Sequence, residues 1–157
     1  MNSRIRRLTL TAVMAGVMLP PADARARQAP HSLRTENDPA MQIQLVILEQ
    51  AFPVTLDANA TARDLIELLP LALTLEDYAA TEKIARLPRR LSIAGAPSGI
   101  DPEPSDLAYY APWGNLAIFY EDFGHSAGLI RLGRIRSGID AFRAKHDIAV
   151  RIEAVPR

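Results

Sequence analysis

Aromatic side chains concentrate within residues 109–120 of the sequence, where the rings are Tyr109, Tyr110, Trp113, Phe119 and Tyr120. Rings of this kind can line an apolar groove, with phenol hydroxyls and an indole N–H at its rim. Consecutive strand residues face opposite sides, so only one of Tyr109 and Tyr110 can face an interior. The alternative is that these rings fill a core and close a hairpin. If they form a groove, the candidate ligand-binding residues are Tyr78, Tyr109, Tyr110, Trp113, Asn115 and Phe119.

Charged side chains surround Tyr78 in the sequence: Asp77, Glu82, Lys83, Arg86, Arg89 and Arg90. An arginine that faces a groove can hold a peptide carbonyl or donate toward a prolyl nitrogen. Such a donor would lower the barrier of ~18–20 kcal/mol to rotation about a peptide bond. Arg86 and Arg89 are therefore the catalytic candidates, and the sequence leaves their role unknown. The alternative is a solvated face whose ion pairs each contribute about 0–1 kcal/mol.

Nucleophilic and metal chemistry have little support in the sequence. His125 and His146 have no metal-ligand spacing, and Ser126 beside His125 is no evidence of a triad. The carboxylates of Asp101, Glu103 and Asp106 cluster without the glycine-punctuated pattern of a calcium loop. We expect no metal and no cofactor, and a hydrolase is disfavoured.

The elements that would position these residues are mainly strands. Alternation over 41–48 and a return over 52–56 predict a hairpin with its turn at 49–51. A helix is predicted from an N-cap at Thr61, with Asp64 reaching back, to Leu69, where Pro70 ends it. Alternation then predicts a strand over 71–75.

The second half of the chain has the same character. A turn-rich loop is predicted over 95–104, strands over 106–111, 116–120 and 128–135, a helical turn over 137–143, and a closing strand over 147–155. Many short strands with one or two helices are typical of a barrel with capping helices.

The N-terminal segment has the pattern of an export signal. Arg4, Arg6 and Arg7 precede an uncharged run over 8–19 that is too short to span a bilayer. Cleavage after Ala24 or Ala26 is predicted, so residues 1–24 are a signal peptide, 25–40 a disordered linker and 41–157 the domain. Sec export is the default, with the twin-arginine route as the alternative. The predicted location is periplasmic or secreted.

Charge and composition restrict the partners. The chain has no net charge, and removal of residues 1–24 takes away three arginines and one aspartate, which leaves −2. A mildly acidic domain is not expected to carry the positively charged surface that binds nucleic acid. No second apolar run is long enough to predict a membrane span after signal cleavage. With no cysteine, the core alone must stabilise the fold. The expected partners are a small molecule, a peptide or a partner protein.

Several runs resemble the small bacterial and archaeal cyclophilin-like proteins, over essentially all of residues 41–139. They are TARDL (61–65), PLALTLEDY (70–78), TEKI (81–84), LPR (87–89), GAP (95–97) and YYAPWGNLAIFY (109–120). The resemblance implies a mainly β fold, a closed barrel of about eight strands with one or two helices at its openings.

Cyclophilins are prolyl isomerases, but their signature is missing here. The chain has no Phe-His-Arg run, and Ile84 and Ala85 precede Arg86, which falls near the place of the catalytic arginine. The sequence therefore predicts an exported, non-catalytic ligand- or peptide-binding module. The alternative is an extracytoplasmic peptidyl-prolyl isomerase with a diverged site.

Overall fold

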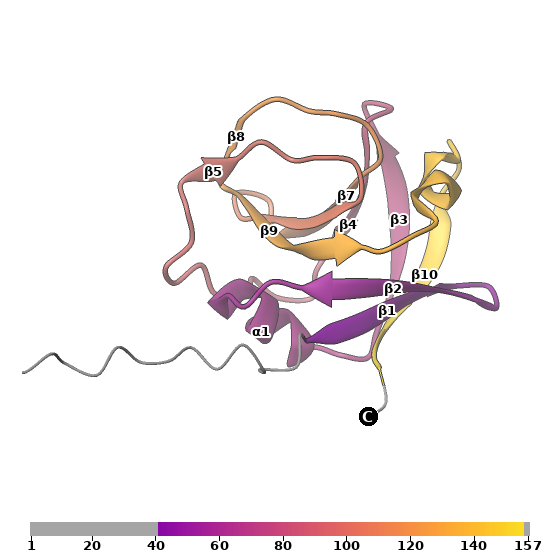
Figure 1. Cartoon of the computed structure of the whole chain (residues 1–157), viewed down its shortest axis with the longest axis horizontal. Helices are drawn as coiled ribbons and strands as arrows, with labels where there is room; N and C mark the ends of the chain where they lie inside the picture. Colours follow the sequence, from indigo (N-terminus) through magenta and orange to yellow (C-terminus); the bar gives the residue numbers. More distant parts are fainter. Residues whose placement is uncertain (1–40, 156–157) are drawn as a thin grey trace, which may run out of the picture. The chain divides into compact units, whose positions relative to one another are not determined.

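Eight antiparallel strands close into a barrel in the computed structural model, which describes residues 41–155 (Figure 1). Around the barrel they are β1 (Gln42–Ile47), β10 (Ile148–Ala154), β3 (Leu71–Tyr78), β4 (Glu82–Arg86), β7 (Asn115–Phe119), β6 (Asp106–Tyr110), β9 (Leu129–Ile135) and β2 (Gln50–Leu56). This architecture confirms the predicted fold class. The predicted signal peptide and linker lie outside the described residues.

Alternation places one face of each strand inside the barrel. Ile43 and Leu45 of β1 and Phe52 and Val54 of β2 are fully or almost fully buried there. The β1–β2 turn is shorter than predicted, because Ile47 pairs with Gln50 and leaves two residues between the strands. Side chains fill the interior, as is usual for eight-stranded barrels of this size.

The helix α1 (Ala60–Ile66) begins before the predicted position. Its N-cap is Asn59, not Thr61: the Asn59 side chain accepts a hydrogen bond of 2.8 Å from the Ala62 N–H. Asp64 does not reach back to the cap. Its carboxylate accepts instead from the backbone N–H of Ser92 and from Arg89, each at 2.6 Å. Asn59, two residues before Thr61, provides this acceptor, so the helix starts there.

The short 3₁₀ helix η1 (Ile139–Arg143) and α1 lie at opposite ends of the barrel (Figure 1). Phe142 of η1 is fully buried, and its ring lies 5.3 Å from that of Phe52 in an edge-to-face contact. Both helices therefore close the barrel ends, as predicted. Within residues 41–155 no helix is long and apolar enough to cross a membrane.

Strand β4 was not predicted, because its alternation is unusual. Lys83 points into the barrel and has no exposed surface, while Glu82 and Ile84 point outward. Lys83 Nζ lies 3.1 Å from Asp77 Oδ1 and donates to the His146 carbonyl at 3.1 Å. The Tyr120 hydroxyl donates to the same Asp77 oxygen at 2.6 Å. This polar cluster occupies part of the interior that apolar side chains fill elsewhere.

Two further strands, β5 (Gly99–Ile100) and β8 (Ser126–Ala127), form a small separate ladder. It runs above β9 in Figure 1. A Cβ atom at Gly99 would lie 2.4 Å from the Ser126 carbonyl oxygen, so only glycine permits this approach. The ladder attaches the long loop of residues 95–104 to the segment that follows β7.

Candidate functional site

The outer face of strands β3, β4, β7 and β6 carries a second apolar cluster, separate from the core. Strand pairing places its side chains in rows: Tyr78, Glu82 and Phe119 form one, and Ile84 and Ala117 are partners in the next. Ala108 and Ala117 are small and fully buried beneath larger neighbours. Small residues at the centre of a face with aromatic surroundings leave a depression.

A cavity of about 180 Å³ lies over this face, and we call it the aromatic groove. It is lined by Tyr78, Glu82, Ile84, Tyr110, Trp113, Asn115, Phe119, Phe123, Ser126 and Leu129. The strands β3, β4, β6, β7 and β9 supply seven of these residues, and Trp113, Phe123 and Ser126 come from the β6–β7 turn and the segment after β7. The groove therefore combines a rigid floor with walls from two connecting segments.

Edge-to-face contacts hold the rings of one wall. The Trp113 ring lies 5.7 Å from the Tyr78 ring and 5.3 Å from the Tyr110 ring, at interplanar angles of 83° and 79°. The Phe119 and Phe123 rings lie 5.9 Å apart. Tyr78, Trp113 and Phe123 nonetheless remain 43%, 47% and 46% exposed. Aromatic side chains left this open around a cavity are typical of binding surfaces.

Glu82 lies at the floor of the groove, between Tyr78 and Phe119 in the strand pairing. Within residues 41–155 its carboxylate takes part in no hydrogen bond or ion pair, and burial alone raises its pKa to about 7. The pKa of this carboxyl therefore lies close to neutral pH. Such a group can donate or accept a proton or a hydrogen bond.

Asn115 supplies a second polar atom to the groove. The residue is 5% exposed, and its side-chain Nδ2 donates to the Leu116 carbonyl at 3.1 Å. Its Oδ1 is buried and has no hydrogen-bond partner among the described residues. A buried acceptor without a partner is costly, so the atom is suited to a ligand that donates a hydrogen bond.

The β6–β7 turn that carries Trp113 is fixed from two sides. Arg90 donates to the carbonyl oxygens of Ala111 and Pro112, at 2.6 and 3.2 Å. On the other side Gly128 has a φ of +78°, and a Cβ there would lie 2.9 Å from the Pro112 ring. The absent side chain at Gly128 therefore allows the segment before β9 to approach the turn.

The structure brings five of the six predicted ligand-binding residues to the groove: Tyr78, Tyr110, Trp113, Asn115 and Phe119. Tyr109 lies in the barrel core instead, 1% exposed, where its hydroxyl accepts from the Leu91 N–H at 3.1 Å. The sequence analysis included Glu82 only among the surrounding charges. It missed Phe123 and Leu129, since nothing local in the sequence shows that they approach Phe119.

The catalytic candidates Arg86 and Arg89 do not line the groove. Arg89 is engaged with Asp64 at 2.6 Å and lies 3.8 Å from Glu67, so it faces α1. Arg86 is exposed, ends β4 and pairs with Asn115 across the strands. Alternation therefore puts Arg86 on the same outer face as Glu82, beside the groove.

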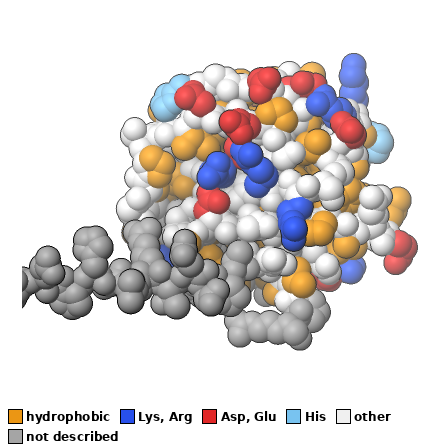
Figure 2. All heavy atoms as spheres, in the orientation of Figure 1, with side chains coloured by type: hydrophobic (Ala, Val, Ile, Leu, Met, Phe, Trp, Pro, Cys, Tyr) orange, Lys and Arg blue, Asp and Glu red, His pale blue; other side chains and the backbone are white. Residues whose placement is uncertain are grey.

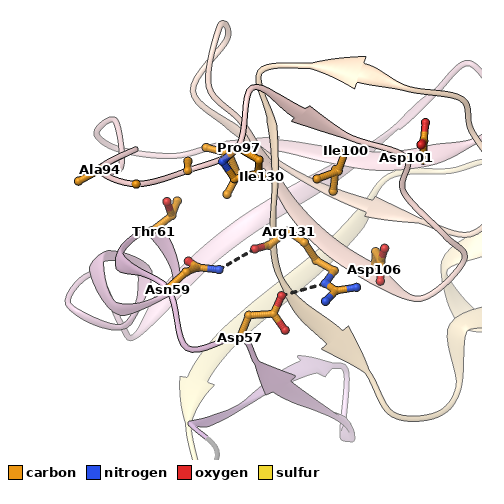
Figure 3. A pocket seen from close by; sticks show the side chains of 12 residues that line it. Asp57, Asn59, Thr61, Ala94, Pro97, Ile100, Asp101, Asp106, Ile130 and Arg131 are labelled. Atoms are coloured by element: carbon orange, nitrogen blue, oxygen red, sulfur yellow. Dashed lines mark hydrogen bonds and ion pairs between the residues drawn. The ribbon is translucent and has the colours of Figure 1, made fainter. Parts of the chain in front are cut away.

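A second cavity, of about 350 Å³, is lined in part by Ile100 of β5 and by Ala94 and Pro97 of the loop before it (Figure 3). Its charged groups are paired, either with one another or with residues outside the lining. Asp57 accepts from Arg131 at 2.8 Å, and Asn59 donates to the Arg131 carbonyl at 2.9 Å (Figure 3). Asp106 accepts from Arg134 at 2.9 Å. Because these polar groups already have partners, this larger cavity is the weaker candidate.

The carboxylates that cluster in the sequence, Asp101, Glu103 and Asp106, lie next to basic side chains in the structure. Glu103 and Asp106 share Arg134, and Asp101 lies 3.6 Å from His125 Nδ1. Among the residues described, no three of His, Cys, Asp and Glu come together to hold a metal ion. Figure 2 shows acidic and basic side chains side by side on one face, without a patch of a single sign.

A family model matches residues 45–153, well over half of the chain, and its description is the cyclophilin-like family. The chain belongs to the cyclophilin-like family. The matched range contains six barrel strands completely. It begins within β1 and ends one residue before the end of β10. A comparison with curated proteins gives no match.

The cyclophilin-like domain is also similar to a solved structure. This is the solution structure of a hypothetical protein from Archaeoglobus fulgidus, with a TM-score of 0.55 and 18% sequence identity. The similarity covers 74% of this chain and 95% of the archaeal one. At this level of identity the likeness concerns the fold alone.

Proposed function

We propose that this cyclophilin-like domain is an exported, non-catalytic module that binds a small molecule or a peptide segment in the aromatic groove. The observation that carries the proposal is the exposure of Tyr78, Trp113 and Phe123 around a cavity with unpaired polar atoms. Large aromatic side chains are normally buried unless another molecule covers them. A few polar groups in an apolar cavity fix the orientation of a ligand.

Within residues 41–155 no arginine lines the groove, and this supports binding over catalysis. An isomerase needs a donor held on the peptide that occupies its groove, because a donor elsewhere does not lower the barrier. Of the nearby arginines, Arg89 binds Asp64 and Arg90 binds backbone carbonyls. The groove floor instead carries the carboxyl group of Glu82.

Prolyl isomerisation is the second candidate, and one observation favours it. Arg86 lies on the same face as the groove, opposite Asn115 in the strand pairing. A peptide longer than the cavity could extend to this side chain. The two functions differ in their dependence on Arg86.

The test is to map where probes bind on ¹⁵N-labelled protein by NMR. A short proline peptide and a neutral apolar probe should shift the Trp113 indole N–H signal and the amides of Ile84 and Leu129. The control region is the second cavity, reported by the amides of Ala94 and Ala96. Shifts confined to that control region, or no shifts with any class of probe, would contradict the proposed binding site.

A further inference from the structure

We propose that the aromatic groove selects an ammonium group that keeps at least one N–H and is attached to an apolar substituent. This inference rests on the proposed function, since it names the class of ligand for the same groove.

The groove has hydrogen-bond acceptors without matching donors or cations. Asn115 Oδ1 is buried with no partner among the described residues, and the Glu82 carboxylate has none either. No lysine, arginine or histidine is among the residues that line the cavity. A ligand that brings positive charge and N–H donors would satisfy both groups at once.

Of the basic residues closest in sequence, Arg86 lies on the same face beside the groove but is not among its lining residues, and Lys83 and Arg90 have other partners. Lys83, next to Glu82, is fully buried on the opposite face of β4 with Asp77. Arg90 donates to the carbonyls of the β6–β7 turn. Among the described residues that line the groove, Glu82 therefore has no counterion, and burial of an unpaired carboxylate is unfavourable.

The aromatic walls favour a cation as well. Aromatic faces carry negative charge density, and a cation within about 6 Å of a ring centroid is attracted to it, most strongly by tryptophan. Trp113, Tyr78 and Tyr110 form one wall, and Phe119 and Phe123 lie together in the same lining. The apolar rings also provide contact for an alkyl substituent.

The cavity sets the size of the group. A volume of about 180 Å³ holds roughly six groups the size of a water molecule. A butylammonium ion is of this scale, and so is the end of a lysine side chain. The same chemistry therefore has two sources, a free amine or a lysine of a peptide.

The test uses Trp113, the chain's only tryptophan, whose fluorescence reports directly on the groove. The full chain is titrated at pH 8 with n-butylammonium chloride and with 1-butanol, its neutral counterpart. We expect n-butylammonium to bind at least tenfold more tightly. Tetramethylammonium, which has no N–H for Asn115, should bind several-fold more weakly than n-butylammonium.

The matched variants are Glu82→Gln and Glu49→Gln, because Glu49 is exposed in the β1–β2 turn, outside the groove lining. Glu82→Gln should weaken n-butylammonium binding at least tenfold and leave 1-butanol binding unchanged, while Glu49→Gln should change neither. Circular dichroism checks that both variants are folded. A blocked Gly-Lys-Gly peptide that binds more tightly than n-butylammonium identifies a peptide as the source, and weaker binding identifies a free amine.

Several results would overturn the inference, and they do so in different ways. If 1-butanol binds as tightly as n-butylammonium, or Glu82→Gln has no effect, the ammonium class is wrong while the groove remains a binding site. Equal binding of tetramethylammonium would remove the requirement for an N–H. If no probe changes the fluorescence and none shifts the groove signals by NMR, the inference and the proposed function both fail.

Discussion

Lys83 and Asp77 form an ion pair at the barrel interior, with 3.1 Å between Lys83 Nζ and Asp77 Oδ1. The lysine side chain has no exposed surface, whereas that of Asp77 is 19% exposed. The hydroxyl of Tyr120, and then Lys83, hold the pKa of Asp77 below its usual range. Burial, and then Asp77, raise the pKa of Tyr120 to about 12.

Lys83→Ala should lower the free energy of unfolding by about 2–5 kcal/mol, because it removes the packing of a fully buried four-carbon stem and leaves a cavity. Lys83→Met should cost less, since it keeps the stem volume and Asp77 still has Tyr120 and solvent. Urea unfolding measures both. Lys145→Ala, at the chain's other and exposed lysine, is the control and should have little effect. Equal stability of Lys83→Ala and wild type would contradict the packing argument.

The raised pKa of Glu82 should make the stability of the fold depend on pH. Its pKa is raised to about 7 in the folded chain, from 4.5. Between these values the folded state binds more protons than the unfolded state, so stability should fall as pH rises through this range and level off above it. Because Glu82 is only partly buried, solvent screening reduces the change below the roughly 3.4 kcal/mol that a shift of this size would give in full.

Glu82→Gln removes this titration. Urea unfolding at pH 5 and pH 8 should therefore show a smaller loss of stability for the variant than for wild type. Glu49→Gln should follow wild type. Parallel pH profiles for wild type and Glu82→Gln would show that the carboxyl is not desolvated.

The affinity for an ammonium probe should respond to pH in the opposite direction. Since the cation prefers an ionised Glu82, n-butylammonium should bind more tightly at pH 8 than at pH 5.5. The other titratable groups in the lining are Tyr78 and Tyr110, which are phenols, and Arg86 on the same strand is charged throughout. Fluorescence titration at the two pH values measures the effect. Tighter binding of n-butylammonium at the lower pH would contradict an attraction between the cation and ionised Glu82.

Isomerase activity on a short proline peptide should be close to background. Arg86→Ala and Arg89→Ala should change it little, because neither side chain lines the groove. A coupled cis–trans assay measures the rate of isomerisation. Trp113→Ala, in contrast, should lose binding of the proline peptide. Strong turnover that collapses in Arg86→Ala would establish the isomerase alternative.

The export proposal has its own test. Mass spectrometry of the protein from its producing cell should find chains that begin at Arg25 or Arg27, the residues after the two predicted cleavage sites. Full-length protein retained inside the cell would contradict the proposal. Nothing in the barrel bears on this result.

Regular alternation made most of the fold predictable. Strands β1, β2, β3, β6, β7, β9 and β10 each carry apolar residues at every second position or a continuous apolar run, and each was predicted within a few residues. Strand β4 was missed because its inward positions are Lys83 and Ala85, while Ile84 faces out. That pattern is typical of a solvated segment. The lysine is accommodated in the barrel by Asp77 of β3 and by Tyr120, which follows β7.

The groove was predictable in part for the same reason. Alternation required Tyr109 and Tyr110 to face opposite sides, and the structure places Tyr109 in the core and Tyr110 in the groove. The sequence alone did not show which faced which way. The state of Glu82 could not be predicted, because its burial depends on rings from three separate segments, Tyr78, Phe119 and Phe123.

Closure of the barrel has a consequence for how a peptide could be recognised. All eight barrel strands have both edges hydrogen-bonded to neighbours, so none can accept an added strand from another chain. The ladder of β5 and β8 does have open edges, but each strand is two residues long. A bound peptide would thus be read by its protruding side chains and not by main-chain pairing. Its sequence, not its capacity to extend a sheet, would decide what this domain captures.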